Sequence, residues 1–397
     1  MERWQVMILR LAFRNIINNG WRSLINVVVI SIVLIIMVWM QAMYYSWIRL
    51  AEIQQSEWEY GEGMLRVRAY DPYDAFSFED SYAPVPGELK PGIESGEVVP
   101  VLLAPASIYP QGRMMGAIVK GMPQQQNILS FPSHRLESGS SDLTPVVIGQ
   151  AMAKSSRLEA GDVFTIRIRD ISGVYNAIDA IVDTVLFIPA PTADVGTIWV
   201  NLTELQRIRG AEDMASYFIF DEGKYRSFSN QDFRYIDRDE YFADLYQMLA
   251  NERFQQVLMY ALLVFLAMIA VFDTQALAVF KRRREIGTLA ALGFTKGRIA
   301  LLFTLEGTLY TMFAFILTPI LGFPLFWYFA SIGFKIPKGF DDFAIQGMTD
   351  TIKFKYPMHE IAIVFLVILV FTAIVSWLPT RRIARLNPVD ALRGKVN

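Results

Sequence analysis

The chain has 397 residues, of which 53% are hydrophobic and 19% charged, and its mean hydropathy is +0.31. This composition is too apolar for an ordinary soluble protein of this length and indicates a membrane protein. The sequence has no cysteine and only two histidines, which excludes a disulfide framework, a thiolate metal site and a histidine-rich metal site. We therefore expect no bound metal and no redox chemistry.

The N-terminal part of the chain combines a cationic segment with a long apolar one. Arg3, Arg10 and Arg14 fall within a narrow sector at helical spacing, which predicts that residues 1–23 form an amphipathic helix on the cytoplasmic membrane surface. An ordinary cationic flank of a membrane anchor would explain the same pattern. Residues 24–48 form an apolar run that is too long for a signal peptide and has no small-x-small cleavage site after it. We predict that this run remains as a transmembrane helix.

Residues 49–256 are predicted to form a separate α+β domain with helical stems. Short β-type runs such as VFTIRIR (163–169) alternate with turn signals, and Asn201 followed by Glu204 marks the start of a short helix. The residues that follow the first apolar run and those that precede the second keep helical periodicity, which predicts the two stems. A stretch of 208 residues is long enough to bury its own core.

Three further apolar segments are long enough to cross a hydrocarbon core of about 30 Å. The second of these segments contains Pro319 and Pro324, so we expect it to kink or to end early. The predicted transmembrane helices are residues 257–280, 299–328 and 358–379, and residues 329–357 are predicted to form a loop outside the membrane.

The distribution of charge predicts how the chain is oriented in the membrane. Residues 1–23, 281–298 and 380–397 together hold 15 Lys/Arg against three Asp/Glu, whereas residues 49–256 hold 18 Lys/Arg against 30 Asp/Glu. By the positive-inside rule, we expect the three basic segments in the cytoplasm. The acidic stretch and the loop of residues 329–357 are then expected on the opposite side.

The basic segment between the second and third apolar runs predicts a short cytoplasmic helix. Ile286, Leu289 and Leu292 recur three residues apart, and Gly293 is a natural helix C-cap. Because such a helix is covalently continuous with two transmembrane helices, it can act as a lever. A stop-transfer charge cluster with an incidental turn of helix is the alternative interpretation.

Methionine and aromatic residues gather in the outer halves of the first two predicted transmembrane helices. They can form an adaptable apolar surface, which would be a candidate cargo cavity if this chain handles a ligand with acyl chains. An aromatic belt at the membrane interface is the alternative. These residues are Met40, Met43, Tyr44, Trp47, Met259 and Tyr260.

Several segments, in order along the chain, resemble the FtsX/MacB superfamily of ABC transporter permeases. KRRREIGTLAALGFTKGRIALLFTLEG (281–307) is similar to the coupling segment of that family, and PTRRIARLNPVDALR (379–393) is similar to its closing motif. Residues 11–32 are similar to the family's start, and residues 146–166 and 197–210 to its outer domain. The resemblance implies a type VII permease in the cell inner membrane. Such a permease has four transmembrane helices, cytoplasmic termini and a MacB-like periplasmic core domain.

The resemblance also implies how the permease works. It forms a dimer with a second copy or a paralogue and binds two copies of a separate ABC ATPase, whose cycle moves the periplasmic domains, an action called mechanotransmission. The sequence has no G-x-x-x-x-G-K-[ST] loop, so we expect ATP and Mg²⁺ at the partner, no cofactor on this chain and no enzymatic activity of its own. The residues implied in ATPase coupling are Arg284, Glu285, Ile286, Gly287, Leu289, Leu292 and Gly293.

Two acidic residues fall inside predicted transmembrane helices, where an unpaired charge costs several kcal/mol. Glu306 matches a Glu-Gly pair of the family, and we expect it to hold the coupling helix to the third transmembrane helix, with proton transfer as the alternative. Asp273 stands where the family often has asparagine, so no family role is transferred to it. It either reaches the cytoplasmic interface or makes a buried polar contact.

Within the superfamily, the lipoprotein-releasing permeases match this chain best in size. MacB-type pumps carry a fused N-terminal ATPase, and FtsX proteins have a smaller outer domain. We therefore expect the cargo to be a lipoprotein or similar amphiphile extracted from the membrane lipid, with a periplasmic acceptor and no nucleic acid. Alternatives are MacB-like export with a membrane-fusion partner, FtsX-like regulation of a cell-wall hydrolase, and a receptor with a large outer domain.

Overall fold

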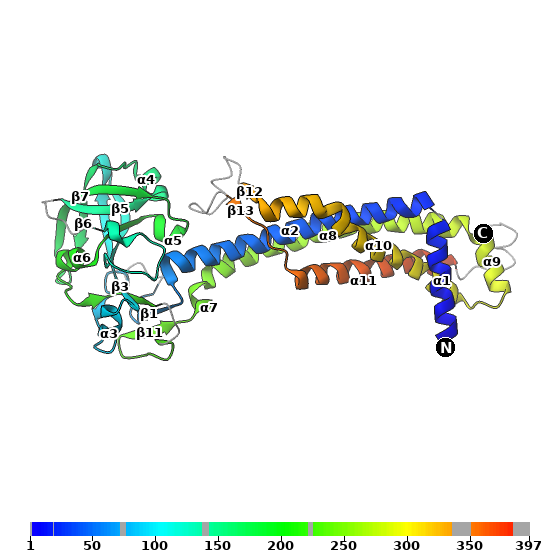
Figure 1. Cartoon of the computed structure of the whole chain (residues 1–397), viewed down its shortest axis with the longest axis horizontal. Helices are drawn as coiled ribbons and strands as arrows, with labels where there is room; N and C mark the ends of the chain where they lie inside the picture. The colour runs from blue at the N-terminus through cyan, green and yellow to red at the C-terminus, as the bar shows by residue number, and fades with distance from the viewer. Residues whose placement is uncertain are drawn as a thin grey trace. The chain divides into compact units, whose positions relative to one another are not determined.

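The computed structural model describes residues 2–18, 20–71, 77–136, 143–220, 225–335 and 351–383. The chain divides into two compact units, a helical unit and a β unit (Figure 1). Helices α2 (Gly20–Gln55) and α8 (Ala243–Lys281) contribute residues to both. The helical unit comprises Met1–Trp47, Met248–Phe334 and Ile352–Asn397, and the β unit comprises Ile48–Gln247 and Lys335–Thr351.

Four helices in the described part of the chain are long and apolar enough to cross a membrane. The predicted transmembrane segments lie within these candidate spans, except that residues 257–280 extend two residues past Ala278. A helix suits such a segment because it satisfies its own backbone hydrogen bonds in an apolar medium. Helix α10 (Lys296–Ser331) continues through Pro319 and Pro324, so the expectation that it ends early is wrong. The four candidate spans are Ser23–Tyr60, Arg253–Ala278, Lys296–Ser331 and Met358–Pro379, the last within α11 (Met358–Ile383).

Apolar side chains of all four long helices form the core of the helical unit. Leu34 of α2, Val271 of α8, Ala314 of α10 and Ile368 of α11 are buried in one cluster. Helices α10 and α11 approach closely at Gly307, where an added Cβ would overlap the side chain of Ser376. Small residues permit this kind of contact between membrane helices.

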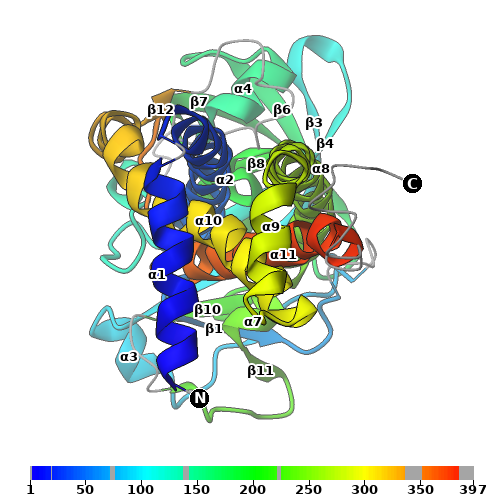
Figure 2. The ribbon, with the colours of Figure 1, turned by 90° about the vertical axis from the view of Figure 1, so that its right-hand side faces the viewer.

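Helix α1 (Glu2–Asn18) crosses the bundle instead of running along it (Figures 1 and 2). Its buried residues Ile8 and Ala12 pack against Leu302 of α10, while Arg10 and Arg14 are exposed. The helix predicted for residues 1–23 is thus shorter than expected. Helix α2 already begins at Gly20, whose φ of +40° is not helical and which therefore marks the change of direction.

Among its described residues, the β unit is built on one mixed sheet of nine strands in the order β11-β1-β10-β3-β4-β8-β5-β7-β6. Strand β3 also pairs with β6, so the six strands from β3 to β6 close into a barrel-like ring. The strands of the ring are β3 (Val98–Tyr109), β4 (Met115–Met122), β5 (Thr144–Gly149), β6 (Val163–Arg169), β7 (Tyr175–Leu186) and β8 (Thr197–Asn201). The extension is β1 (Gly63–Val67), β10 (Tyr217–Phe220) and β11 (Phe233–Ile236).

The helical segments of the β unit between its strands are short. The longest, α6 (Leu202–Arg209), has eight residues and begins where predicted, because the Asn201 side chain accepts a hydrogen bond from the N–H of Thr203 at 3.0 Å. The expected α+β balance is not confirmed, since the long strands β3 and β7 dominate the unit. The other segments are η1 (Ser56–Tyr60), α3 (Lys90–Glu94), η2 (Pro110–Gly112), η3 (Ser133–Arg135), α4 (Gln150–Ser156), α5 (Pro191–Asp194) and α7 (Arg238–Tyr241).

Two further strand pairs are short. Strand β2 (Ala83–Pro84) pairs with β9 (Met214–Ala215), and β12 (Phe334–Lys335) pairs with β13 (Thr351–Ile352). Most of the predicted outer loop of residues 329–357 and of the predicted tail of residues 380–397 lies outside the described residues.

Candidate functional site

The predicted coupling helix is α9 (Arg283–Ala291), which lies in the chain between α8 and α10. Gly293, two residues after its end, has a φ of +89°. The N–H groups of Gly293 and Phe294 donate to the carbonyl oxygens of Ala290 and Leu289 at 3.1 and 3.0 Å. A left-handed glycine that closes such hydrogen bonds is a common helix C-cap, as the sequence predicted.

The residues expected to contact the ATPase lie on different faces of α9. Ile286 and Gly287 are buried, and Ile286 packs against α10. Leu289 is half-buried between α1 and α10. These three residues hold the helix in place, and the remaining four are the ones that another protein can reach. The exposed residues are Arg284, Glu285, Leu292 and Gly293.

Arg282, directly before α9, joins two carboxylates. Its Nε and Nη2 donate to the two carboxylate oxygens of Glu285 at 2.6 and 2.7 Å, and its Nη1 donates to Oε2 of Glu306 at 2.9 Å. Its guanidinium lies 4.9 Å from the centre of the Phe303 ring. Glu306 is only 1% exposed, and Asn15 of α1 is a further hydrogen-bond partner. The start of α9 is therefore fixed to α10, and the same carboxylate also contacts α1.

Arg282 was not singled out by the sequence reasoning, which treated it as one cation of a polybasic run. A buried carboxylate needs a charged partner. The sequence alone could therefore have suggested that one of the four consecutive cations of residues 281–284 pairs with Glu306. Burial alone would lower the pKa of Arg282, but the hydrogen bonds to Glu285 and the charge of Glu306 raise it above its ordinary value. Arg282 thus stays charged.

Other buried or half-buried polar side chains link the long helices of the helical unit. Each pair lies between two different helices, so these contacts fix the helices relative to one another. The pairs are Ser23 with Tyr310 at 3.4 Å, Asn26 with Thr274 at 3.0 Å, and Thr311 with Thr372 at 3.0 Å.

Asp273 does not take part in this layer of buried contacts. Its side chain lies exposed on α8, whereas the adjacent Thr274 turns inward to Asn26. The buried polar contact considered for Asp273 is therefore not what the structure shows.

The six residues predicted to line a cargo cavity are not equivalent. Met259 is 47% exposed on α8, while Met40, Met43, Tyr44 and Trp47 of α2 are half-buried. Exposed and half-buried apolar side chains on helices of this length can contact lipid or an acyl chain. The assignment of these residues to a cargo site stays a prediction.

Tyr260 also takes part in a polar junction that the sequence reasoning missed. Its hydroxyl donates to Oε1 of Gln41 at 2.9 Å and accepts from Nε2 of Gln256 at 2.8 Å. Gln41 in turn donates to the carboxylate of Glu360. The junction joins α2, α8 and α11. Polar residues one helical turn apart on α8, Gln256 and Tyr260, were the signal in the sequence.

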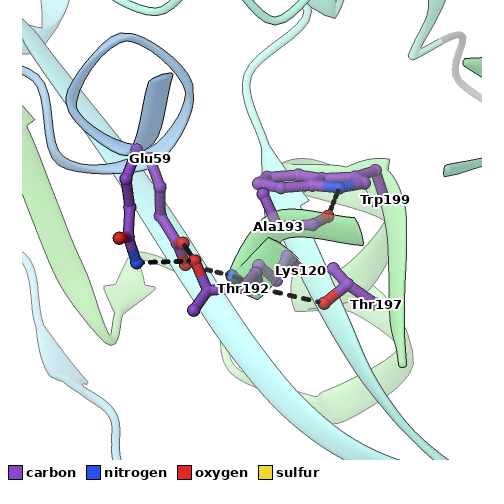
Figure 3. Close-up of polar contacts among 7 residues, drawn as sticks. Glu59, Lys120, Thr192, Ala193, Thr197 and Trp199 are labelled. Carbon is purple, nitrogen blue, oxygen red and sulfur yellow. Dashed lines mark hydrogen bonds and ion pairs between the residues drawn. The ribbon is translucent and has the colours of Figure 1, made fainter. Parts of the chain in front are cut away.

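A buried ion pair in the β unit was also missed (Figure 3). Lys120 of β4 pairs with Glu59 of η1, and the two residues are 5% and 8% exposed. The Lys120 ammonium also donates to the carbonyl of Thr192 at 3.3 Å and lies 5.3 Å from the centre of the Trp199 ring. The hydroxyl of Thr192 donates to Glu59. The pair therefore ties η1, which continues α2, to the strands and to α5.

A tyrosine of α7 completes this cluster. Tyr241 is a hydrogen-bond partner of Glu59, and its ring lies 4.6 Å from that of Tyr60. Burial, together with the negative charge of Glu59, raises the pKa of Tyr241 well above its usual value. Tyr241 is therefore protonated and can donate its hydrogen to the carboxylate. Glu59 lies in η1, which follows α2, and Tyr241 lies in α7, which precedes α8. The last residues of α2 and the first residues of α8 are therefore both close in sequence to this one cluster.

In the described ranges, no three His, Asp or Glu side chains come close enough together to hold a metal ion. The structural features fit a membrane protein with four long apolar helices, a short helix packed against α10 and α1, and a barrel-like β unit.

Comparison with known proteins supports a more specific class. Residues 257–388, about a third of the chain, match the family model described as FtsX-like permease C-terminal. The matched segment contains α9, Glu306, most of the second candidate span and all of the last two, and it supports an ABC permease of the FtsX/MacB type. Proteins of this family are the membrane subunits of transporters that work with an ABC ATPase. No curated protein matches the chain.

Proposed function

We propose that this chain is the permease subunit of an ABC transporter that extracts a lipoprotein, or a similar amphiphile, from the inner membrane. The contact of Arg282 with Glu306 carries the proposal, because it fixes the start of α9 to α10. At the other end of α9, Leu292 is 73% exposed and is accessible to another protein. A charge-assisted hydrogen bond of this kind is stronger than a neutral one. Displacement of α9 by an ATPase would therefore move α10 with it.

In this proposal, two copies of the ATPase bind ATP and Mg²⁺ and dock on α9 of a permease dimer. The motion reaches the β unit, on the periplasmic side, through α2 and α8. The Glu59–Lys120 pair supports this route because it fixes the end of α2 to strand β4 by a buried contact. The exposed Met259 and the half-buried methionines of α2 would receive the acyl chain of the cargo.

The docking step is tested by Leu292→Glu, which places a charge on the exposed end of α9. The variant should lose most of the co-purifying ATPase, because charged residues are depleted from the core of protein interfaces. Met114→Glu is the matched control, since Met114 is 69% exposed but belongs to the β unit. Equal ATPase recovery with both variants would refute docking on α9.

The cargo is tested with the permease and its ATPase in proteoliposomes. We expect ATP-dependent release of a triacylated lipoprotein and none of the same protein without its acyl chains. Release of the unacylated form at the same rate would favour export of soluble peptides, and ATP-dependent activation of a cell-wall hydrolase without any release would favour the regulatory alternative.

A further inference from the structure

A groove of about 380 Å³ lies in the helical unit where α1 meets α2 and α10. Its volume falls within the range of roughly 300–1,000 Å³ typical of ligand pockets. The lining is almost wholly apolar, with Ser23 as its one polar side chain. That hydroxyl faces Tyr310 at 3.4 Å, so it need not bind a ligand. Other lining residues are Ile16, Ile17, Leu24, Phe313 and Ile320.

The groove is somewhat shorter than one leaflet of a bilayer. On α2 it runs from Gly20 to Val27 and on α10 from Phe313 to Ile320. Seven residues of helix rise about 10 Å. This is less than half of a hydrocarbon core of about 30 Å. The groove can therefore hold the part of one acyl chain that lies nearest the headgroup, from a lipid in the leaflet next to α1.

Two exposed cations stand on the same side of α1 as the open rim of the groove. Arg10, Arg14 and Ile17 fall within a narrow sector of α1 at helical spacing, and Ile17 lines the groove. All three are exposed, whereas Ile8 and Ala12 on another side of α1 are buried. Arg14 lies about one helical turn and Arg10 about two turns before Ile17 on α1. An apolar slot with two arginines along the same helix side is complementary to an acyl chain that carries a negatively charged headgroup.

We infer that this groove binds an anionic glycerophospholipid of the leaflet on the α1 side, with one acyl chain between α1, α2 and α10 and the phosphate near Arg10 and Arg14. The lipid would occupy the groove between α1, α2 and α10. Figure 2 shows how α1 crosses the bundle there. Because α1 also contacts Glu306 through Asn15, the lipid would stabilise the position of the helix that supports the coupling contact. The inference goes beyond the proposed transport function, since it concerns the permease without its ATPase.

The test is native mass spectrometry of the full-length permease in micelles with equal amounts of dioleoyl-phosphatidylglycerol and dioleoyl-phosphatidylcholine. We expect the wild type to retain phosphatidylglycerol preferentially. Arg10→Gln with Arg14→Gln should lower that preference roughly tenfold or more, since each cation near an anionic lipid surface contributes about a factor of five. The matched control is Lys353→Gln with Lys355→Gln, which removes two exposed cations close to the other end of the bundle.

A second variant tests the groove itself. Ile316→Trp with Ile320→Trp fills its rim at two residues that are 60% and 65% exposed, so the fold should tolerate the change. Retention of both lipids should then fall to background. Equal effects of the arginine and lysine variants, no preference in the wild type, or unchanged retention in the tryptophan variant would each overturn the inference. Because no ATPase is present, none of these results depends on the transport function.

Discussion

At the residue scale, the consequence of burying Glu306 depends on Arg282. If the cation of a buried ion pair is removed, the carboxylate remains buried without compensation for its lost hydration. The free energy of unfolding then falls by roughly 3–5 kcal/mol for well-buried pairs. Arg282 has a side chain that is 15% exposed, so we expect the lower end of this range for Arg282→Met. Glu306→Gln should cost less, because the amide oxygen can still accept from Arg282 while Glu285 holds the remaining charge.

The comparison of the two variants separates a structural role of Glu306 from proton transfer. Thermal unfolding in detergent should give a lower midpoint for Arg282→Met than for Glu306→Gln, and the double variant should recover part of the loss. Glu306→Gln should also keep most of the transport rate when the ATPase is supplied. A Glu306→Gln protein that assembles fully but transports nothing would speak for a proton-transfer role instead.

At the scale of elements, the cluster around Glu59 joins the end of α2 to the barrel. Residues Ser56–Tyr60 form a π-helix, a geometry that widens the turn and is frequent at functional positions. Lys120→Met leaves Glu59 buried without its cation, for which we expect a loss of about 3 kcal/mol or more in the free energy of unfolding. Lys90→Met is the matched control. It breaks the exposed pair with Asp213 and should cost less than about 1 kcal/mol.

The same substitution has a mechanical consequence under the proposed function. Suppose that the Glu59–Lys120 contact carries motion from α2 into the β unit. In a complex with the Lys120→Met permease, the partner ATPase should then hydrolyse ATP at a near-normal rate, while the rate of cargo release falls. Hydrolysis and release are measured on the same proteoliposomes. Parallel loss of both activities would indicate general misfolding, and unchanged release would show that the contact is not needed for coupling.

At the scale of the whole molecule, features set by local sequence could be predicted. The long apolar helices follow from runs of about 20 apolar residues, a property of each segment alone. The end of α9 was predicted because Gly293 provides the left-handed conformation that the cap requires. The start of α2 was predicted at residue 24 instead of Gly20, because an apolar run alone does not mark where the chain changes direction. Gly20, a residue that readily adopts a positive φ, was the available signal.

Features that depend on distant segments could not be predicted. The barrel closes through the pairing of β3 with β6, strands more than 50 residues apart in sequence, and a β-type run does not specify its partner. The same holds for the ion pairs. Arg282 is one of four consecutive cations, and only the packing of α9 on α10 selects it for Glu306. Lys120 and Glu59 show no shared pattern before the chain folds.

The orientation of the whole molecule is the remaining prediction, and the cysteine-free sequence makes it directly measurable. From the charge asymmetry we predict that α9 lies in the cytoplasm and the β unit on the other side of the membrane. Leu292→Cys and Met114→Cys introduce single thiols at highly exposed positions of α9 and the β unit. A membrane-impermeant maleimide should label Leu292→Cys only in inside-out vesicles and Met114→Cys only in right-side-out vesicles.

A third variant controls for the integrity of the vesicles and the fold. Val264→Cys lies in the core of the helical unit, where Val264 is 8% exposed, and should react only after denaturation. Labelling of Leu292→Cys and Met114→Cys from the same side would contradict the charge rule for this chain. It would also exclude an ATPase on α9 with a β unit across the membrane, because energy from the cytoplasm could then no longer reach the other side by the route through α2 and α8.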